Sequence, residues 1–247
     1  MFKDYVRLQK IFSKSGIMSR RTTESMINSK RITVNGNLVS KLSTRINLNI
    51  TELYLDGSKI IISNKSQIYF VINKPYGMLS TMLDKHSRSC IGDVVNYKIK
   101  ENKKLFHIGR LDIKTQGLLI LTNDGELAHR VMHPSFKILK TYIVFVLGKF
   151  TYDIENKLIK GIKLHDGIVY VDNFEVLDTI ANKTLIKITI HEGRNRIIRR
   201  MLSYLNFMVQ KLVRISIDSI RLGSQKSNSI RILRNKEINA LYQATGI

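Results

Sequence analysis

The first sixty residues combine helical and strand-like spacing of apolar positions. Apolar residues in the segment 8–12 recur at helical spacing, and Gly16 is a suitable C-terminal stop for that helix. Ser19 follows and can cap a second helix, which the pattern continues to about Asn28. Two helices are therefore expected before the first hairpin.

Two short hairpins are expected after these helices. Asn35-Gly36 and Asp56-Gly57 each lie between two short apolar segments. Both dipeptides favour tight two-residue turns, in which the backbone adopts positive φ angles. Residues 1–62 are thus predicted to form a small domain of two helices and short strands.

The later part of the chain alternates strand-like segments with a few helices. A capping-box-like Asn123-x-x-Glu126 predicts a helix through about Val131, and an apolar stripe predicts another helix over residues 195–205. Many strands with few helices favour an α+β sheet domain rather than a doubly wound one. The strand candidates are 69–72, 118–121, 142–147, 168–171, 174–177, 185–190 and 212–217.

A short polar stretch separates the two patterns. Residues 63–67 read SNKSQ and are the predicted linker. This division leaves a small first domain over residues 1–62 and a sheet domain over residues 68–247.

The charge of the chain favours a polyanionic partner. Lys and Arg number 41 against 19 Asp and Glu, which gives a formal net charge of +22. Such an imbalance causes self-repulsion and favours nucleic acid as the partner. An AT-rich genome would explain part of the Lys excess but would not by itself favour Arg. An anionic membrane is the weaker alternative, because no basic amphipathic helix stands apart from the fold.

The remaining composition favours a soluble, cytoplasmic monomer. The 247 residues are 43% hydrophobic, which is ample for a packed core. Cys90 is the single cysteine, so no intrachain disulfide can form, as suits a reducing cytosol. The charged N-terminus lacks the apolar segment of a signal peptide, and no apolar run approaches the ~18 residues of a membrane span. The high positive charge disfavours self-association.

Basic residues of the small first domain are candidates for RNA contact. Arg20 and Arg21 fall in the first turn of the second predicted helix, where cations oppose the helix dipole. That conflict is tolerable if the two arginines face phosphate. Lys30 and Arg31 follow the same helix, and all four residues are predicted to bind RNA.

A second basic cluster lies in EGRNRIIRRM, residues 192–201. It contains four arginines: Arg194, Arg196, Arg199 and Arg200. Glu192 is the only nearby acid in the sequence. A solvated basic face would explain a single arginine, whereas four favour phosphate contact, since guanidinium groups match phosphate oxygens. One of them can also pair with Asp112.

The sequence lacks the motifs of most other kinds of catalytic or cofactor site. His191-Glu192 is followed by Asn195 where a zinc-protease motif needs a second histidine. The six histidines show no metal-ligand cluster, and the chain has no phosphate loop, Rossmann glycine motif or serine elbow. Neither a metal nor a cofactor is therefore expected. By elimination, a catalytic site would depend on a lone carboxylate.

Asp112 in GRLD, residues 109–112, is the candidate for that carboxylate. A turn carboxylate, a salt-bridge partner and a chemical reagent all fit the local sequence. The local sequence alone favours the turn, because Gly109 and Gly117 flank the pair of charged residues.

Four motifs in order resemble one enzyme family. NKPYG (73–77), HIGRLDIKTQGLLILTNDGELAHRVMHPS (107–135), KTY (140–142) and EGRNRIIRRM are similar to the RsuA/RluB/RluE/RluF branch of the pseudouridine synthases. The N-terminal LQKIFSKSGIMSRRTTESMINSKRITVNG resembles the alpha-L RNA-binding module of that branch. The resemblance covers nearly the whole chain and implies a catalytic domain with a mixed, mainly antiparallel sheet. The stretch GELAHRVMHPS looks most like the RluB-like members, which modify large-subunit ribosomal RNA.

The resemblance implies roles for three residues. Asp112 matches the catalytic aspartate, which attacks the target uridine before the uracil is detached, rotated and rejoined through carbon 5. Addition to the base, addition to the sugar and initial proton abstraction are all compatible with that match. Tyr142 matches the tyrosine that stacks on the flipped base. Arg199 matches the arginine that pairs with the aspartate and favours its ionised form.

The resemblance also implies contacts around the target nucleotide. Arg110 would hold the RNA backbone or help to flip the target out of its stack. Ile197 and Ile198 would close the uracil pocket, and Lys74 in NKPYG is grouped with the RNA-binding residues. One position departs from the family pattern: Ile197 stands where the family has Gln, so an amide hydrogen bond is lost.

These matches favour an enzyme that isomerises uridine in ribosomal RNA or in a ribosomal subunit assembly intermediate. A non-catalytic rRNA-binding or assembly protein of the same fold is the main alternative, and a small-subunit rRNA enzyme is another. The complete set of Asp112, Tyr142 and Arg199 favours activity. A structural ribosomal protein is disfavoured, because a sheet domain of this size exceeds what simple rRNA binding needs.

Overall fold

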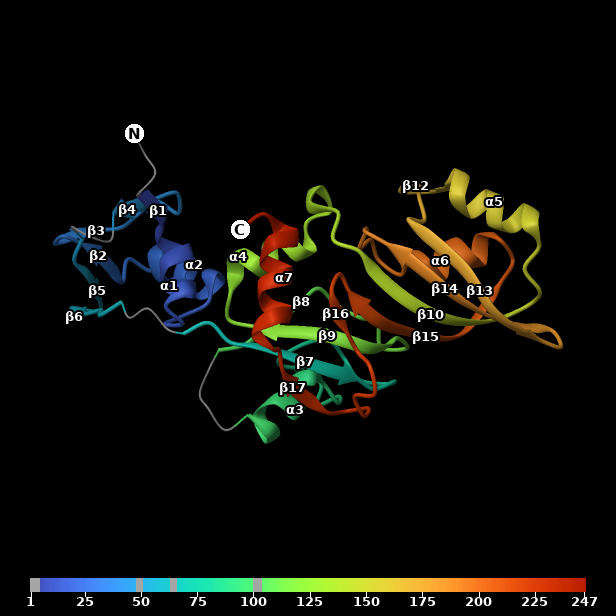
Figure 1. The fold of residues 1–247 in the computed structure, drawn as a ribbon. Coiled ribbons are helices and arrows are strands. Elements are labelled where there is room, and N and C mark those ends of the chain that lie inside the picture. Colours follow the sequence, from blue (N-terminus) through green and yellow to red (C-terminus); the bar gives the residue numbers. More distant parts are fainter. Residues whose placement is uncertain (1–4, 48–50, 63–65, 100–103) are drawn as a thin grey trace. The chain divides into compact units, whose positions relative to one another are not determined.

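The computed structural model describes residues 5–47, 51–62, 66–99 and 104–247. The chain divides into two compact units, Met1–Ile68 and Tyr69–Ile247 (Figure 1). The division falls beside the expected linker at 63–67, of which residues 63–65 lie outside the described residues. Each unit is treated separately below.

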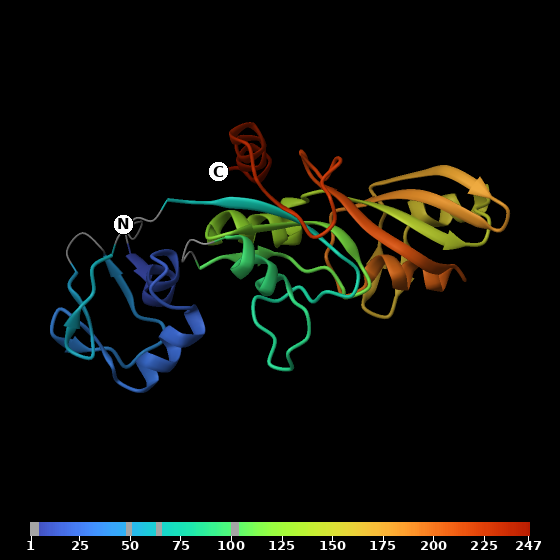
Figure 2. The ribbon, with the colours of Figure 1, turned by 90° about the horizontal axis from the view of Figure 1, so that it is seen from below.

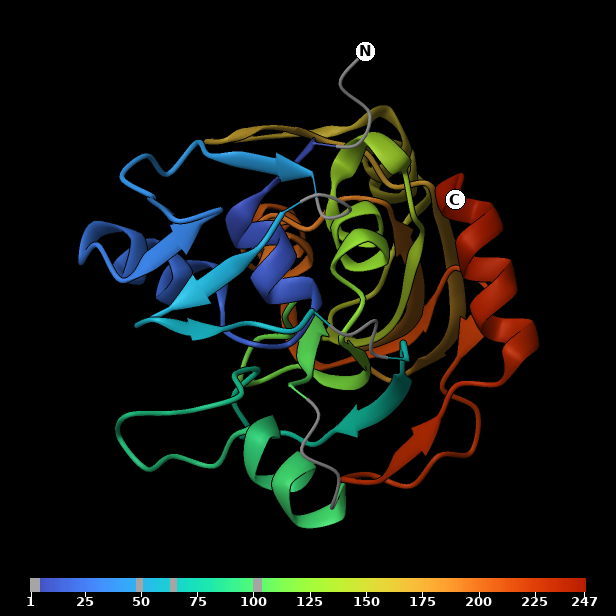
Figure 3. The same ribbon diagram turned by 90° about the vertical axis from the view of Figure 1, so that its left-hand side faces the viewer.

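The N-terminal unit consists of two helices and short strands (Figure 3). Helix α1 (Leu8–Lys14) and helix α2 (Arg20–Asn28) bury apolar side chains against the strands. Ser19 caps α2 by accepting a hydrogen bond from the Thr22 backbone at 3.1 Å, as the sequence predicts. The strands are β1 (Tyr5–Arg7), β2 (Ile32–Val34), β3 (Asn37–Leu38), β4 (Arg45–Asn47), β5 (Leu53–Leu55) and β6 (Ser58–Lys59).

Both predicted hairpins of this unit are confirmed. Strand β2 pairs with β3 around Asn35-Gly36, and β5 pairs with β6 around Asp56-Gly57. The φ angles are 48° and 79° in the first turn and 50° and 77° in the second. Positive φ at both turn positions matches the twist of the flanking strands, which explains the Asn-Gly and Asp-Gly sequences. The resulting sheet has the order β3-β2-β5-β6, and β1 pairs with β4 separately.

The second unit is built on one large mixed sheet. Its strand order is β13-β14-β10-β15-β9-β7-β17, with β16 paired to β15 and β8 paired to β9. Among the described strands of this sheet only the β9–β15 pair is parallel, so the expectation of a mixed, mainly antiparallel α+β domain is confirmed. The strands are β7 (Tyr69–Lys74), β8 (Phe106–Ile108), β9 (Gln116–Thr122), β10 (Lys140–Leu147), β13 (Asn173–Ile180), β14 (Lys183–Ile190), β15 (Met208–Ile217), β16 (Ile220–Arg221) and β17 (Ile230–Ile232). A separate hairpin joins β11 (Ile162–Leu164) and β12 (Gly167–Val169).

The helices of this unit include three that the apolar pattern did not predict. The helices are α3 (Ile91–Lys98), α4 (Gly125–Met132), α5 (Tyr152–Lys160), α6 (Ile197–Tyr204) and α7 (Asn235–Thr245), with a short 3-10 turn at Pro134–Phe136. Helices α3, α5 and α7 were missed. Helix α5 spans only nine residues and buries a single side chain, Leu158, so it has too few turns for its helical spacing to be recognised. Figure 2 shows the connection from β7 to α3 projecting from the unit.

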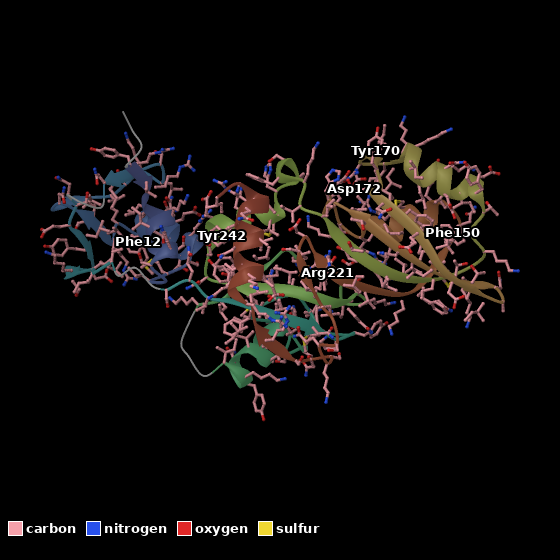
Figure 4. The ribbon with its side chains drawn as sticks, viewed as in Figure 1. Phe12, Phe150, Tyr170, Asp172, Arg221 and Tyr242 are labelled. Atoms are coloured by element: carbon pink, nitrogen blue, oxygen red, sulfur yellow. The ribbon has the colours of Figure 1, made fainter. Side chains whose placement is uncertain are left out.

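The start of α4 corrects one expectation. The N-cap is Asp124, whose carboxylate accepts hydrogen bonds from the backbones of Glu126 and Leu127. Asn123 was expected to fill this place. The Asp124 carboxylate also accepts a hydrogen bond from the Tyr69 hydroxyl at 2.9 Å and one from Tyr242, the tyrosine of α7 that Figure 4 labels. A carboxylate held from three sides fixes both helices against β7.

An apolar core and a pair of stacked aromatic rings support the sheet. Residues of α4 and α7 pack with β7 and β9 in one core, which includes Val71, Ile120 and Leu127. At the other end, the ring of Phe150 stacks on Phe207 at 4.2 Å between centroids (Figure 4). No helix within the described residues is long and apolar enough to span a membrane.

Candidate active site

A row of paired residues crosses the middle of the large sheet. Lys74 of β7 pairs with Gly117 of β9, Gly117 pairs with Arg214 of β15, and Arg214 pairs with Tyr142 of β10. Directly paired residues project from the same face of a sheet. Lys74, Arg214 and Tyr142 therefore share one face, with no side chain at position 117.

Gly117 allows the close approach of β9 and β15. A Cβ atom at this position would lie 2.2 Å from the carbonyl oxygen of Arg214, and the φ angle of Gly117 is +107°. Any side chain would therefore force apart the parallel pair at the centre of the row. This explains the first glycine after GRLD, Gly117.

The loop that carries Asp112 is fixed by backbone contacts on both sides. The hydroxyl of buried Ser80 donates to the Leu111 carbonyl at 2.8 Å and accepts from the Leu111 backbone N–H at 3.1 Å. The Gly77 N–H donates to the Ile113 carbonyl at 2.9 Å. The Asp112 carboxylate itself is half-buried and makes no hydrogen bond or ion pair with the described residues. The loop is thus rigid while its carboxylate stays available.

Lys74 is buried beside this loop. Its side chain is fully inaccessible, and its ammonium donates to the carbonyls of Pro75 at 2.9 Å and Met78 at 2.8 Å. Burial lowers the pKa of Lys74 to about 8, although the negative charge of Asp112 opposes that shift. Lys74 was predicted to bind RNA, and in the fold its ammonium is buried and bonded to two backbone carbonyls. The ammonium of Lys74 instead interacts electrostatically with the negative charge of Asp112.

Arg199 of α6 reaches the same loop from the other side. It donates to the carbonyl of Lys114 at 2.8 Å and to that of Val209 at 3.3 Å. Burial and the charge of Arg196 lower its pKa, while the charge of Asp112 raises it. Among the described residues the two groups interact through their charges but form no direct ion pair. In place of the expected ion pair with Asp112, Arg199 is hydrogen-bonded to the loop that carries Asp112, and its positive charge lies near the carboxylate.

Tyr142 and the two isoleucines of α6 are buried in the same unit. Tyr142 is 8% exposed, and its strand pairing with β15 shifts register between Thr141 and Tyr142. Such bulges alter the direction of neighbouring side chains and are frequent beside active sites. Ile197 and Ile198 are 5% and 3% exposed at the start of α6. All three side chains are thus largely buried in the folded unit.

Comparisons with known proteins identify this arrangement. A family model described as RNA pseudouridylate synthase matches residues 68–204. The chain is a member of the RNA pseudouridine synthase family. It is 48% identical over 242 residues to an uncharacterized RNA pseudouridine synthase of Mycobacterium tuberculosis, covering 98% of this chain and 95% of that protein. It is 34% identical over 237 residues to ribosomal large subunit pseudouridine synthase B of Bacillus subtilis, covering 95% of both chains.

A solved structure extends the likeness to the fold. A crystal structure titled as a pseudouridylate synthase superposes with a TM-score of 0.68 at 28% identity, covering 96% of this chain and 99% of that one. The matches span nearly the full length of both chains. As a family member, the chain is an isomerase that converts uridine to pseudouridine in RNA.

Two arginines of this pseudouridine synthase have carboxylate partners that the sequence did not indicate. Arg200 donates to both oxygens of Asp166, at 2.9 and 2.8 Å. Arg194 donates to Asp166 at 3.2 Å and to Glu192 at 2.6 Å. The neighbouring arginines hold the pKa of Asp166 down at about 2. Glu192 is the only acid close to these arginines in the sequence, but Asp166, in the β11–β12 turn, pairs with two of them in the fold.

The other predicted RNA-binding residues are on the surface. Arg20, Arg21, Lys30, Arg110 and Arg196 are all exposed. Arg31 is exposed as well but is paired with Asp56, with a bond between Nε and Oδ1 of 2.7 Å. An exposed ion pair of this kind contributes little to stability, so phosphate can replace Asp56 as the partner.

Sequence reasoning missed two buried cations near Tyr142. Arg214 is 3% exposed and lies directly opposite Tyr142. Lys140 is 8% exposed and donates to the carbonyls of Ile138 and His191, both at 2.9 Å. KTY, with Lys140 two residues before the tyrosine, was quoted for the resemblance, but nothing in the sequence indicated that these two cations are buried. Within the described residues no cluster of His, Cys, Asp and Glu could hold a metal ion.

Proposed function

We propose that this enzyme isomerises one uridine of large-subunit ribosomal RNA, with Asp112 as the nucleophile. The observation that carries the proposal is a carboxylate on a rigid loop, near enough to the buried ammonium of Lys74 and to the guanidinium of Arg199 for its charge to act on the pKa of both. The relative from Bacillus subtilis, whose name specifies the large subunit, supports the choice of RNA. The proposed substrate is this RNA, either free or within a ribosomal subunit assembly intermediate.

The reaction is an isomerisation in which nothing is added or removed. The bond between ribose C1′ and uracil N1 breaks, a bond between C1′ and C5 forms, and the hydrogen lost from C5 is replaced by one gained at N1. Such a reaction balances without a redox or group-transfer cofactor. A carboxylate that attacks the nucleotide splits the exchange into two easier steps. The nearby positive charges of Lys74 and Arg199 attract the negative charge that a carboxylate nucleophile carries.

The target must leave the RNA stack before this chemistry can occur. Tyr142 would stack on the extruded base, with Ile197 and Ile198 as the apolar wall of the pocket. Arg110 and Arg196 are exposed, and we assign them to the phosphates beside the target. Because Arg194 and Arg200 are occupied by carboxylates, we assign them to holding the β11–β12 hairpin on α6.

The N-terminal unit is proposed to be an alpha-L RNA-binding module. Its two helices and NG hairpin support that reading, together with the exposed arginines at the start of α2. We further propose that the enzyme works as a cytoplasmic monomer. A positive charge of this size keeps copies apart while attracting RNA.

Mapping of pseudouridine tests the proposal. Ribosomal RNA from cells that lack the protein is incubated with the purified enzyme or with Asp112→Asn, then treated with carbodiimide and read by primer extension. A stop in large-subunit RNA that needs Asp112 is the expected result. A stop in small-subunit RNA would favour the alternative substrate. No stop with either protein would favour a non-catalytic rRNA-binding role.

The pKa of Lys74 predicts an alkaline limit to activity. The ammonium is protonated below pH 8 and supports the negative charge of Asp112, whereas deprotonation above pH 8 removes that support. We expect the single-turnover rate to fall as the pH rises through about 8, and we call this fall the alkaline limb. Lys74→Met should be slower than the wild type and should lack the alkaline limb. Rates of pseudouridine formation between about pH 6.5 and 9 provide the measurement.

Lys140 provides the matched control for this profile. Its pKa is also lowered to about 8 by burial, but the charges that act on it are those of Arg214 and Asp172 and not that of Asp112. Lys140→Met should therefore keep the alkaline limb. If the limb disappears in Lys140→Met and persists in Lys74→Met, the assignment to Lys74 is wrong.

The exposed arginines of α2 should set the salt dependence of RNA binding. Arg20→Gln and Arg21→Gln should each reduce the slope of log affinity against log salt by roughly 0.7 to 1 unit, because each removes about one phosphate contact. Lys30→Gln and Arg31→Gln should behave alike. The control is Lys41→Gln, which removes an exposed charge elsewhere in the same unit. Slopes unchanged in the arginine variants, or changed equally in the control, would contradict the assignment.

A further inference from the structure

Arg214 occupies a central place in the site without a role in the proposed mechanism. Its guanidinium lies on the face shared by Tyr142 and Lys74, and Gly117 leaves the neighbouring position on β9 without a side chain. Adjacent strands are about 4.8 Å apart, so Arg214 is an immediate neighbour of the ring of Tyr142. A base stacked on that ring would lie within reach of the guanidinium.

The hydrogen-bonding capacity of Arg214 is mostly unused. Nε donates to the Leu118 carbonyl at 2.8 Å. Nη2 is buried and has no hydrogen-bond partner. A guanidinium carries five N–H donors, and buried polar groups without partners are rare in folded proteins. Its unpaired donors therefore suit a ligand that enters the site.

The charges around Arg214 favour an acceptor rather than a donor. No carboxylate among the described residues pairs with Arg214. The pKa of Lys140 is lowered mainly by burial and, to a smaller extent, by the positive charge of Arg214, so the two cations are close. The negative charge of Asp172 partly offsets this lowering. Two buried positive charges with few negative charges nearby attract groups that carry partial negative charge.

We propose that Arg214 binds the O4 edge of the target uracil and so selects uridine over cytidine. Uracil presents an acceptor at O4, whereas cytosine presents an amino donor at the same position. A guanidinium has donors only, so the amino group of cytosine would face other donors without a partner. Phosphate is disfavoured as the ligand, because Arg214 is 3% exposed and the RNA backbone stays outside.

The test compares affinities for two RNAs that differ in one base. The inference depends on the proposed rRNA substrate for its probe, a fragment of the mapped RNA with either U or C at the target. Turnover of the U fragment by the wild-type enzyme is measured first, so a failure of the proposed function is recognised separately. Binding is then measured in the Asp112→Asn protein, which does not consume the fragment.

Arg214→Met should remove the preference for U. We expect Asp112→Asn to bind the U fragment about tenfold or more tightly than the C fragment, and the double variant with Arg214→Met to bind both within about threefold. The ratio should collapse because affinity for U falls. An unchanged ratio in the folded double variant would overturn the proposal, and so would a parallel loss of both affinities.

A second variant covers the case in which Arg214→Met does not fold. Arg214→Lys keeps the buried charge but lacks the planar fork of donors, so it should retain an intermediate preference for U. Thermal unfolding establishes whether each variant is folded. A full preference for U in Arg214→Lys and in Arg214→Gln would also overturn the proposal, because neither variant reproduces the arginine geometry.

Discussion

Asp112→Asn should abolish pseudouridine formation. The amide cannot act as a nucleophile, so the single-turnover rate should fall by at least about 10⁴-fold. RNA binding should change little, because the exposed cations that contact phosphate are untouched. The rate is measured on the mapped RNA fragment, and the affinity is measured by titration of the same RNA.

Asp153→Asn is the matched control for that loss. Asp153 is exposed in the first turn of α5, and the same amide replacement there removes an equal charge. Its rate should stay close to that of the wild type. Residual activity of Asp112→Asn above about a hundredth of the wild-type rate would show that another group attacks the nucleotide.

Arg199→Met should produce the second largest loss of activity. The side chain holds the carbonyl of Lys114, two residues beyond Asp112, and supplies a positive charge near the carboxylate. Its removal loosens the loop and weakens the electrostatic support together. We expect the catalytic rate to fall by about 10²- to 10³-fold, the range typical for loss of one preorganised electrostatic contact.

The adjacent Arg200 separates this effect from a general loss of charge on α6. Arg200 is bonded to Asp166 and does not contact the Asp112 loop. Arg200→Met should lower thermal stability slightly, by at most about 1 kcal/mol for a partly exposed pair, while the rate stays within about threefold. Equal losses of rate in the two variants would show that α6 acts only as a scaffold.

The sequence determined the local structures with strong chemical signals. The two NG and DG turns followed from the positive φ angles that they require, and the Ser19 cap followed from its position before the helix. The order of motifs around GRLD was sufficient to recognise the family. Asp112, Tyr142 and Arg199 could be predicted as site residues because each lies in a short continuous motif that matches the family.

Short amphipathic helices were beyond the reach of the pattern. Helix α5 buries one leucine, and α7 buries two residues, Leu241 and Thr245. Their stability comes from packing against other elements, which a single sequence does not reveal. The cap of α4 was displaced by one residue for a related reason, because tertiary contacts with two tyrosines hold Asp124 in place.

Tertiary structure decided which charged side chains are free. Asp166 is 28 residues before Arg194 and neutralises two arginines that looked unpaired. Lys74 belongs to a motif that suggested RNA contact, yet β7 carries it into the interior. Arg214 shows no motif of its own and becomes a neighbour of Tyr142 only through strand pairing. Residue type and local order are written in the sequence, whereas burial and pairing arise from contacts between distant segments.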